Sequence, residues 1–260
     1  MAFVLNGIMI DRLVEGVATG SAGMLYVLKN LQDVSITTTA NTKEKQDAQG
    51  NTIRTFYTGK TGNLEGNNVF LDLAVLGETT GSGLELASAT KKLKVPFIQE
   101  YTTSTASATV EGIVEGTLQI VGIDANGTIL EKYTKDTTAA KGKYALAANK
   151  ITFPTEVEDG VLTFLVKCER EVTSGGKVTD SSNKFPKSCE LLLKGIVATT
   201  CEEDTRVIYI KIPRFLVSPE VNLTFSTDST MPFSGKMEVN YCSNDKELYS
   251  IYYAEDEVGE

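Results

Sequence analysis

VSITTTANTKEKQDAQGNTIRTFYTGKTGNLEGNN, residues 34–68, is the stretch that decides the fold of this 260-residue chain. Its centre, DAQGN (47–51), is typical of a turn, because Asp and Asn side chains bond their own backbone and Gly adopts positive φ. Residues 25–40 before it read as a long strand, and residues 52–58 after it as a returning strand. The sequence therefore predicts a long hairpin arm over 34–58.

The middle of this hairpin, TTTANTKEKQ (37–46), is strongly polar. A ribbon without alternating apolar residues cannot pack on its own core. We therefore expect it to be either disordered in isolation or ordered against another subunit. The alternative is a solvated, flexible loop.

A glycine-rich bridge at 59–66 follows the arm, and one short amphipathic helix is expected after it. Asn68 is a favourable N-cap and Gly77 a favourable stop, so the helix is placed at 68–76. Residues 84–92 are a weaker helical candidate.

Short alternating runs of Val, Ile, Thr, Tyr and Phe fill the remaining chain, which predicts a mainly β fold. Residues 102–170 resemble a separate β unit, because TLQIVGID and TILEKYT flank the turn ANG (125–127) as in a hairpin. We therefore expect 1–101 and 189–260 to form one β-sandwich or barrel, and 102–188 to be an inserted Ig-like β domain with flanking linkers. Further strands are expected at 93–101, 143–153, 161–169, 189–200, 205–213, 221–226, 234–242 and 247–253.

Composition excludes several classes of function. The net charge is −9, with a sequence pI of about 4.8, whereas nucleic-acid binders carry basic surfaces. Histidine is absent, which removes Ser-His-Asp and Cys-His catalysis. GKTG at 59–62 lacks the upstream glycine that a phosphate loop needs at its fixed spacing. No pair of carboxylates stands out, so we predict a protein that is not an enzyme and has no cofactor.

Four cysteines, Cys168, Cys189, Cys201 and Cys242, lie in the last part of the chain. They form no close pair of the kind that zinc sites use, so no metal site is predicted. Two disulfides are arithmetically possible. Buried, reduced thiols are the simpler expectation, because cysteine is among the most buried residue types.

The N-terminal sequence MAFVLNGIMIDRLVEG has no basic segment followed by a long apolar run. No stretch of the chain approaches 18 apolar residues. We therefore expect no membrane anchoring and synthesis in a cytoplasm.

The order of these features resembles the major tail (tail tube) protein of long-tailed bacteriophages. The resemblance is carried by residues 34–68, by VFLDLAVLG (69–77) and by FSGKMEVNYCSNDKELYSIYY (233–253). It covers about 1–100 and 189–260. It implies a tail-tube-like β-sandwich, to which the 102–170 region is an added domain.

The resemblance implies a structural virion protein that forms stacked, hexameric rings, whose inner strands join into a continuous β-barrel. DNA would pass without specific binding through an acidic lumen. The implied partners are further copies of the chain and other tail proteins, such as the terminator and the tape measure. The protein would be made in the host bacterial cytoplasm and located in the virion tail. The arm residues expected to contact another subunit are Ile36, Thr38, Lys43, Lys45, Asp47, Ile53 and Phe56.

Two other interpretations stay open. In a capsid decoration or baseplate protein, the Ig-like part would be the functional module and the arm an anchor. A binding module or an unrecognised enzyme would work without polymerising. Self-assembly into rings therefore separates the first interpretation from the others.

Overall fold

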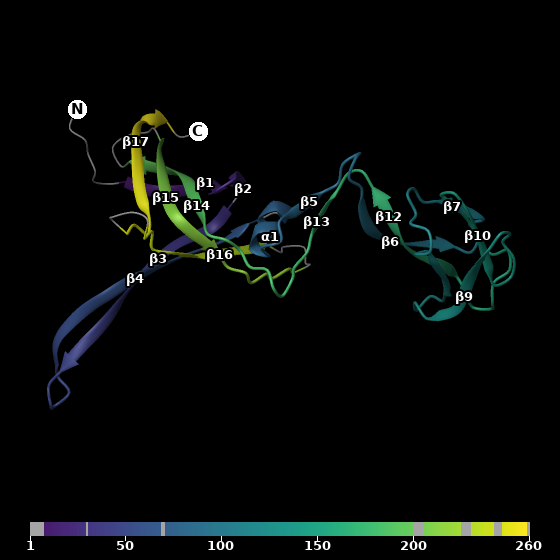
Figure 1. The fold of residues 1–260 in the computed structure, drawn as a ribbon, viewed down its shortest axis with the longest axis horizontal. Helices are drawn as coiled ribbons and strands as arrows, with labels where there is room; N and C mark the ends of the chain where they lie inside the picture. Colours follow the sequence, from purple (N-terminus) through teal and green to yellow (C-terminus); the bar gives the residue numbers. More distant parts are fainter. Residues whose placement is uncertain are drawn as a thin grey trace. The chain divides into compact units, whose positions relative to one another are not determined.

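The computed structural model describes residues 8–29, 31–68, 71–199, 205–224, 230–241 and 246–258. The fold is mainly β, as predicted, and the described residues contain a single α-helix (Figure 1). The chain forms two compact units. The first unit is Met1–Leu84 with Val178–Glu260, and the second is Glu85–Lys177.

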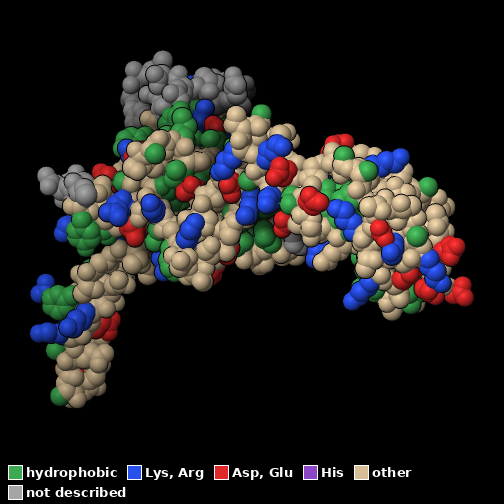
Figure 2. All heavy atoms as spheres, turned by 45° about the vertical axis from the view of Figure 1, so that its right-hand side comes forward, with side chains coloured by type: hydrophobic (Ala, Val, Ile, Leu, Met, Phe, Trp, Pro, Cys, Tyr) green, Lys and Arg blue, Asp and Glu red, His purple; other side chains and the backbone are tan. Residues whose placement is uncertain are grey.

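The first unit is built on an eight-stranded sheet. Its main path runs in the order β2-β1-β14-β15-β16-β4-β3, and β17 also pairs with β15. All these pairings are antiparallel. The β3–β4 hairpin extends beyond the rest of the unit (Figures 1 and 2). The bounds are β1 (Ile8–Gly20), β2 (Gly23–Lys29), β3 (Leu31–Gln46), β4 (Thr52–Asn68), β14 (Cys189–Thr199), β15 (Thr205–Val217), β16 (Met231–Met237) and β17 (Ser250–Val258).

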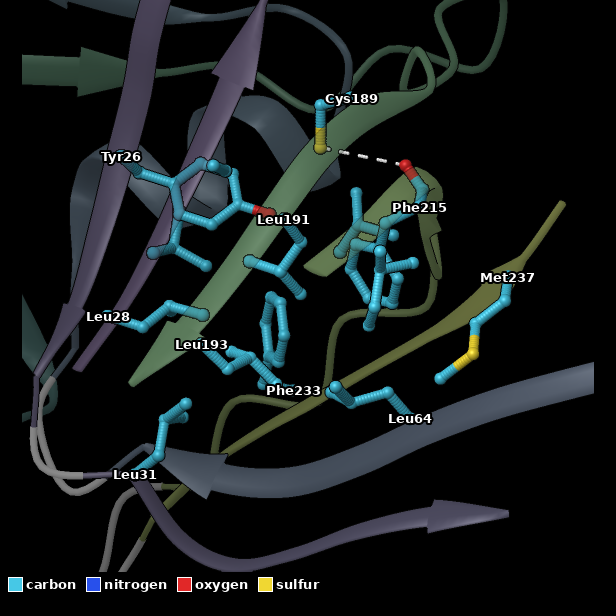
Figure 3. Packing of buried hydrophobic residues seen from close by; sticks show 14 of the residues in the cluster. Tyr26, Leu28, Leu31, Leu64, Cys189, Leu191, Leu193, Phe215, Phe233 and Met237 are labelled. Atoms are coloured by element: carbon cyan, nitrogen blue, oxygen red, sulfur yellow. Dashed lines mark hydrogen bonds between the residues drawn. The ribbon is translucent and has the colours of Figure 1, made fainter. Parts of the chain in front are cut away.

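The core of the first unit follows from alternation along its strands. In β14, Leu191 and Leu193 are fully buried, whereas Leu192 between them is exposed. Figure 3 shows these leucines packed with side chains from β2, β4, β15 and β16. The rings of Phe215 and Phe233 lie 5.7 Å apart, centroid to centroid, and help to fill this core.

Two of the four cysteines are free, buried thiols, as predicted: Cys168 in the second unit and Cys189 in the first. The Cys189 thiol donates to the carbonyl of Phe215 at 3.6 Å (Figure 3). Burial raises the pKa of both thiols. Cys201 and Cys242 lie outside the described residues.

Gly235 in β16 is required by the packing around it. A Cβ at this position would lie 2.3 Å from Cζ of Phe215 and 2.6 Å from the carbonyl oxygen of Leu216. We therefore expect Gly235→Ala to lower the free energy of unfolding of the first unit by about 1–3 kcal/mol, because the buried ring must move. Gly59→Ala is the matched control, since nothing lies within 4 Å of a Cβ there. Chemical denaturation measures both variants, and equal stability of the two would contradict this account.

The helix α1 spans Leu73–Thr79, so the predicted position, 68–76, was wrong. Asp72 caps it: the carboxylate accepts from the backbone N–H of Ala74 at 2.7 Å. Asn68, the expected cap, is instead the last residue of β4. Gly77, the expected stop, lies inside the helix. A Cβ at this position would lie 2.7 Å from the carbonyl carbon of Gly83, so close packing explains the glycine.

Three other local predictions were also wrong. Residues 59–66 are part of β4, whose backbone pairs with β3 on one side and β16 on the other. Gly62 leaves room for the side chain of Met237, because a Cβ at position 62 would lie 2.7 Å from the Met237 sulfur. Residues 84–92 form the short strand β5 (Leu84–Leu86) and a turn rather than a helix. Of the strand expected at 221–226, residues 221–224 form none, and 225–226 are not described.

The second unit is a seven-stranded sheet in the order β6-β12-β8-β9-β10-β11-β7. The predicted hairpin around 125–127 is confirmed as β8–β9, where the Asp124 carboxylate accepts from the backbone N–H of Asn126 and of Thr128, each at 2.8 Å. β9 and β10 are parallel, and the Ig-like assignment stays a prediction. The bounds are β6 (Leu93–Thr102), β7 (Ser107–Thr109), β8 (Gln119–Ile123), β9 (Ile129–Asp136), β10 (Lys143–Ala147), β11 (Lys150–Thr152) and β12 (Thr163–Val172).

The boundaries between the units lie at 84/85 and 177/178, whereas the boundaries predicted from the sequence are 101/102 and 188/189. β6 accounts for the first difference, because it pairs with β12 along its whole length. The chain enters and leaves the second unit through a two-stranded sheet of β5 and β13 (Gly176–Val178). Next to it, the N–H of Ala87 donates to the carbonyl of Gly175 at 2.9 Å.

Candidate functional site

The β3–β4 hairpin forms a long arm that its own chain does not cover. The two strands pair from Leu31 with Asn68 at the base to Gln46 with Thr52 at the tip. Every residue from 37 to 61 is exposed, and we call this segment the exposed arm. At a rise of about 3.3 Å per residue, its β3 strand is about 33 Å long. The predicted hairpin is thus confirmed, and it is a paired ribbon rather than an open loop.

The turn at the tip has the chemistry predicted for DAQGN. The carboxylate of Asp47 accepts from the backbone N–H of Gln49 at 2.9 Å and of Asn51 at 2.8 Å. Gly50 has a φ of 86°, a value that favours glycine. The hydrogen bonds from Asn51, followed by the weaker ones from Gln49 and Gly50, hold the pKa of Asp47 below its ordinary value. The ionised carboxylate therefore helps to close the turn at neutral pH.

One face of the exposed arm is basic. The register places Lys43 opposite Phe56 and Lys45 opposite Arg54, and cross-strand partners share a face of the ribbon. The Arg54 guanidinium carbon lies 5.1 Å from the centroid of the Phe56 ring. These four residues form what we call the basic face.

The other face of the arm carries apolar side chains. Ile53 and Tyr57 are 69% and 78% exposed, and Phe56 on the basic face is 41% exposed. Figure 2 shows hydrophobic and basic side chains gathered on the arm. None of these three side chains belongs to the hydrophobic core of either unit. They are the kind of side chain that dominates the binding free energy of protein interfaces.

A comparison of the sequence with protein-family models identifies a known family. The model of the YomU/Tube protein family matches residues 21–253. The chain belongs to the YomU/Tube protein family. The matched region contains the arm, α1 and the whole second unit. No curated protein matches the chain.

Membership in a tube protein family supports the resemblance to phage tail tube proteins and a structural role. The described residues contain no group of three or more His, Cys, Asp or Glu side chains that could hold a metal ion. GKTG at 59–62 lies in the paired strand β4, which is not the loop that a phosphate site needs. The acidic run 202–204 is not described. No helix in the described part of the chain is long and apolar enough to span a membrane.

The structure separates the predicted contact residues of this family member into four groups. Ile36 and Thr38 lie at the base, where Ile36 is half-buried against the core. The tip and its flanks hold the others: Asp47 is in the turn, Lys43, Lys45 and Phe56 lie on the basic face, and Ile53 lies on the opposite face.

Sequence reasoning missed Tyr57 and Arg54. The alternation of apolar residues at 53 and 57 along one strand was the signal that could have found Tyr57. Arg54 could have been found from the uneven charge of the arm. Residues 37–61 hold four basic residues, Lys43, Lys45, Arg54 and Lys60, against the acidic Glu44 and Asp47, although the chain as a whole carries −9.

Proposed function

We propose that this chain is the subunit of a phage tail tube, and that copies assemble into stacked, hexameric rings with a channel for genomic DNA. The observation that carries the proposal is the exposed arm, in a chain that belongs to a tube protein family. The arm holds uncovered apolar side chains far from its own core. Assembly with other copies would remove them from water.

Ring formation follows from the asymmetry of such a contact. An arm on one copy and the surface that receives it on the next are different surfaces, so the contact is heterologous. Heterologous contacts close into rings when the rotation between copies allows it. Stacked rings leave two open ends, which the terminator and tape measure proteins of the virion tail would contact.

The ends of the sheet support the same arrangement. β2 and β3 end the path of the eight-stranded sheet, and neither pairs with a further described strand on its outer side. Uncovered strand edges are open to pairing with another chain. Pairing between neighbouring copies would join their sheets into a continuous barrel around the channel.

The charge of the chain fits a channel that DNA crosses without binding. The net charge of −9 opposes the phosphate backbone. Like charges repel across a narrow lumen, which keeps the DNA from adhering to the wall. Specific DNA binding is therefore no part of the proposed function.

Electron microscopy of the purified chain tests the proposal directly. We expect negative-stain images of rings or tubes with a central channel, and six-fold symmetry in averaged end views. Mass photometry of the same sample should give a discrete species of six subunits or its multiples. A chain that remains monomeric at every concentration would contradict the proposal and favour a capsid decoration or baseplate protein.

A further inference from the structure

The sheet of the second unit ends in two strands of very different length. Among the described strands, β7 pairs with β11 alone at one end, and β6 pairs with β12 alone at the other. β7 has three residues, which offer little backbone to another chain, whereas β6 has ten. An edge of that length is open to pairing unless something prevents it.

The hydrogen bonds of β12 show which residues of β6 face this outer edge. Pro96 is the cross-strand partner of Glu169. The N–H of Glu169 donates to Oγ1 of Thr117 at 3.0 Å, and its carbonyl accepts from the N–H of Val114 at 2.9 Å. Both partners lead into β8, on the side of β12 away from β6. Bonded and non-bonded pairs alternate in an antiparallel ladder, and this one has no bulge along its ten residues, so the even-numbered residues of β6 direct their backbone groups outward.

These outward residues also place their side chains on the solvent face of the sheet. Lys94, Pro96, Ile98 and Glu100 are all exposed, and Ile98 is 67% exposed. Phe97, between two of them, is half-buried and packs on the core of the second unit. The outer edge of β6 thus has one charged residue of each sign near its ends and a proline and an isoleucine between them.

Apart from the proline, this edge is complementary to itself. Two copies of β6 that pair antiparallel about a two-fold axis at position 97 place Lys94 opposite Glu100 and position 96 opposite Ile98. Opposite charges across two strands stabilise the pairing. Both copies would use the same surface, which is the arrangement of a symmetric dimer.

Pro96 interrupts this pairing at its centre. Proline has no backbone N–H, and its ring occupies the space of the missing hydrogen. Under the two-fold axis the loss occurs twice, once from each copy, on either side of the axis. Proline is therefore found on sheet edges that stay unpaired.

We infer that Pro96 closes the outer edge of β6 to a second copy of this chain, so that the second unit makes no strand pairing between copies. The terminal strands of the first unit, β2 and β3, contain no proline. The inference does not depend on the proposed function. In an assembly, however, second units would be held at high local concentration, where an open edge would join copies wrongly.

The variant Pro96→Thr tests this role in the full chain. It restores the N–H and suits a strand. We expect self-association at least about tenfold tighter than in the wild type, because two hydrogen bonds are gained. Analytical ultracentrifugation should show dimers where the wild type is monomeric, or larger particles where the wild type forms rings. Pro219→Thr, at an exposed proline outside the described strands, is the matched control and should sediment like the wild type.

A second substitution identifies the surface that associates. Adding Glu100→Lys to Pro96→Thr places two lysines opposite each other in the two-fold register, which destabilises the pairing. The double variant should therefore sediment like the wild type. The inference would be overturned by Pro96→Thr sedimenting like the wild type, or by a double variant that associates as strongly as the single one.

Hydrogen exchange of the wild type gives a measurement that needs no variant. The amides of Val95 and Phe97 should exchange slowly, because they face β12. The amides of Lys94, Ile98 and Glu100 should exchange rapidly at every protein concentration. Protection of these three amides that rises with concentration would show that the edge pairs between copies, and would also overturn the inference.

Discussion

Replacing residues 42–58 with an Asn-Gly turn is expected to abolish self-assembly while leaving the subunit folded. Asn41 and Gly59 are cross-strand partners, so a two-residue turn closes the shortened hairpin in the same register. The change removes Ile53, Phe56 and Tyr57, none of which belongs to the core. The free energy of unfolding of the monomer should therefore change by less than about 0.5 kcal/mol.

The loss of association should be large, because exposed aromatic residues at an interface each contribute about 2 kcal/mol or more. That corresponds to an association weaker by about thirtyfold or more for each side chain. Sedimentation velocity measures the loss, and the thermal transition of the same sample reports the fold. Gln49→Ala is the control, because it changes the tip and keeps both faces of the arm and the Asp47 carboxylate. Rings formed by the shortened chain would show that assembly does not need the arm.

Phe164→Ala is expected to destabilise the second unit alone, by about 3–5 kcal/mol. The Phe164 side chain is fully buried and stacks on Phe153, with ring centroids 4.8 Å apart and planes 2° from parallel. The Tyr133 ring meets it edge-on at 5.6 Å. Truncation leaves a cavity in the middle of this aromatic cluster, which the surrounding strands can fill only in part.

The loss of stability should be confined to the second unit, because the hydrophobic cores of the two units share no residue. Differential scanning calorimetry should resolve two transitions in the wild type, of which only one moves to lower temperature in the variant. Ile129→Ala, in the same unit at a side chain that is 52% exposed, should leave both transitions in place. If both transitions shifted together in Phe164→Ala, the two units would be one cooperative structure.

The elements that could be predicted from the sequence are those in which local chemistry and strand periodicity agree. Asp47 and Gly50 mark the tip of the arm, and Asp124 marks the β8–β9 turn, because each closes its turn with bonds to nearby backbone. Glycines were misread where the reason for them is distant in the sequence. Gly62 lies in a strand because Met237 packs above it, and no local pattern reports that contact.

The helix shows a related limit. Asn68 and Asp72 are both acceptable N-caps by type, and tertiary pairing decides between them, since Asn68 is paired into the sheet between β3 and β16. An apolar groove on the first unit, lined by residues of β1, β3, β14, β15 and β17, could not be predicted from the sequence. Its walls join Ile10, Ile208 and Ile251, which come together only through the topology of the sheet. The arm could be proposed as a contact surface from its polarity, but its two distinct faces depend on the register.

The paired strands β5 and β13 have a consequence for how the gene can be altered. The two points at which the second unit joins the first are one hydrogen bond apart, from Ala87 to Gly175. Any domain whose own ends lie a strand spacing apart has the geometry to replace it in frame, and a short turn has the geometry to replace it altogether. The first unit thus contains one insertion point, which the second unit occupies. In a repeating assembly, a domain inserted at that point would occur once per subunit and would repeat with the period of the polymer.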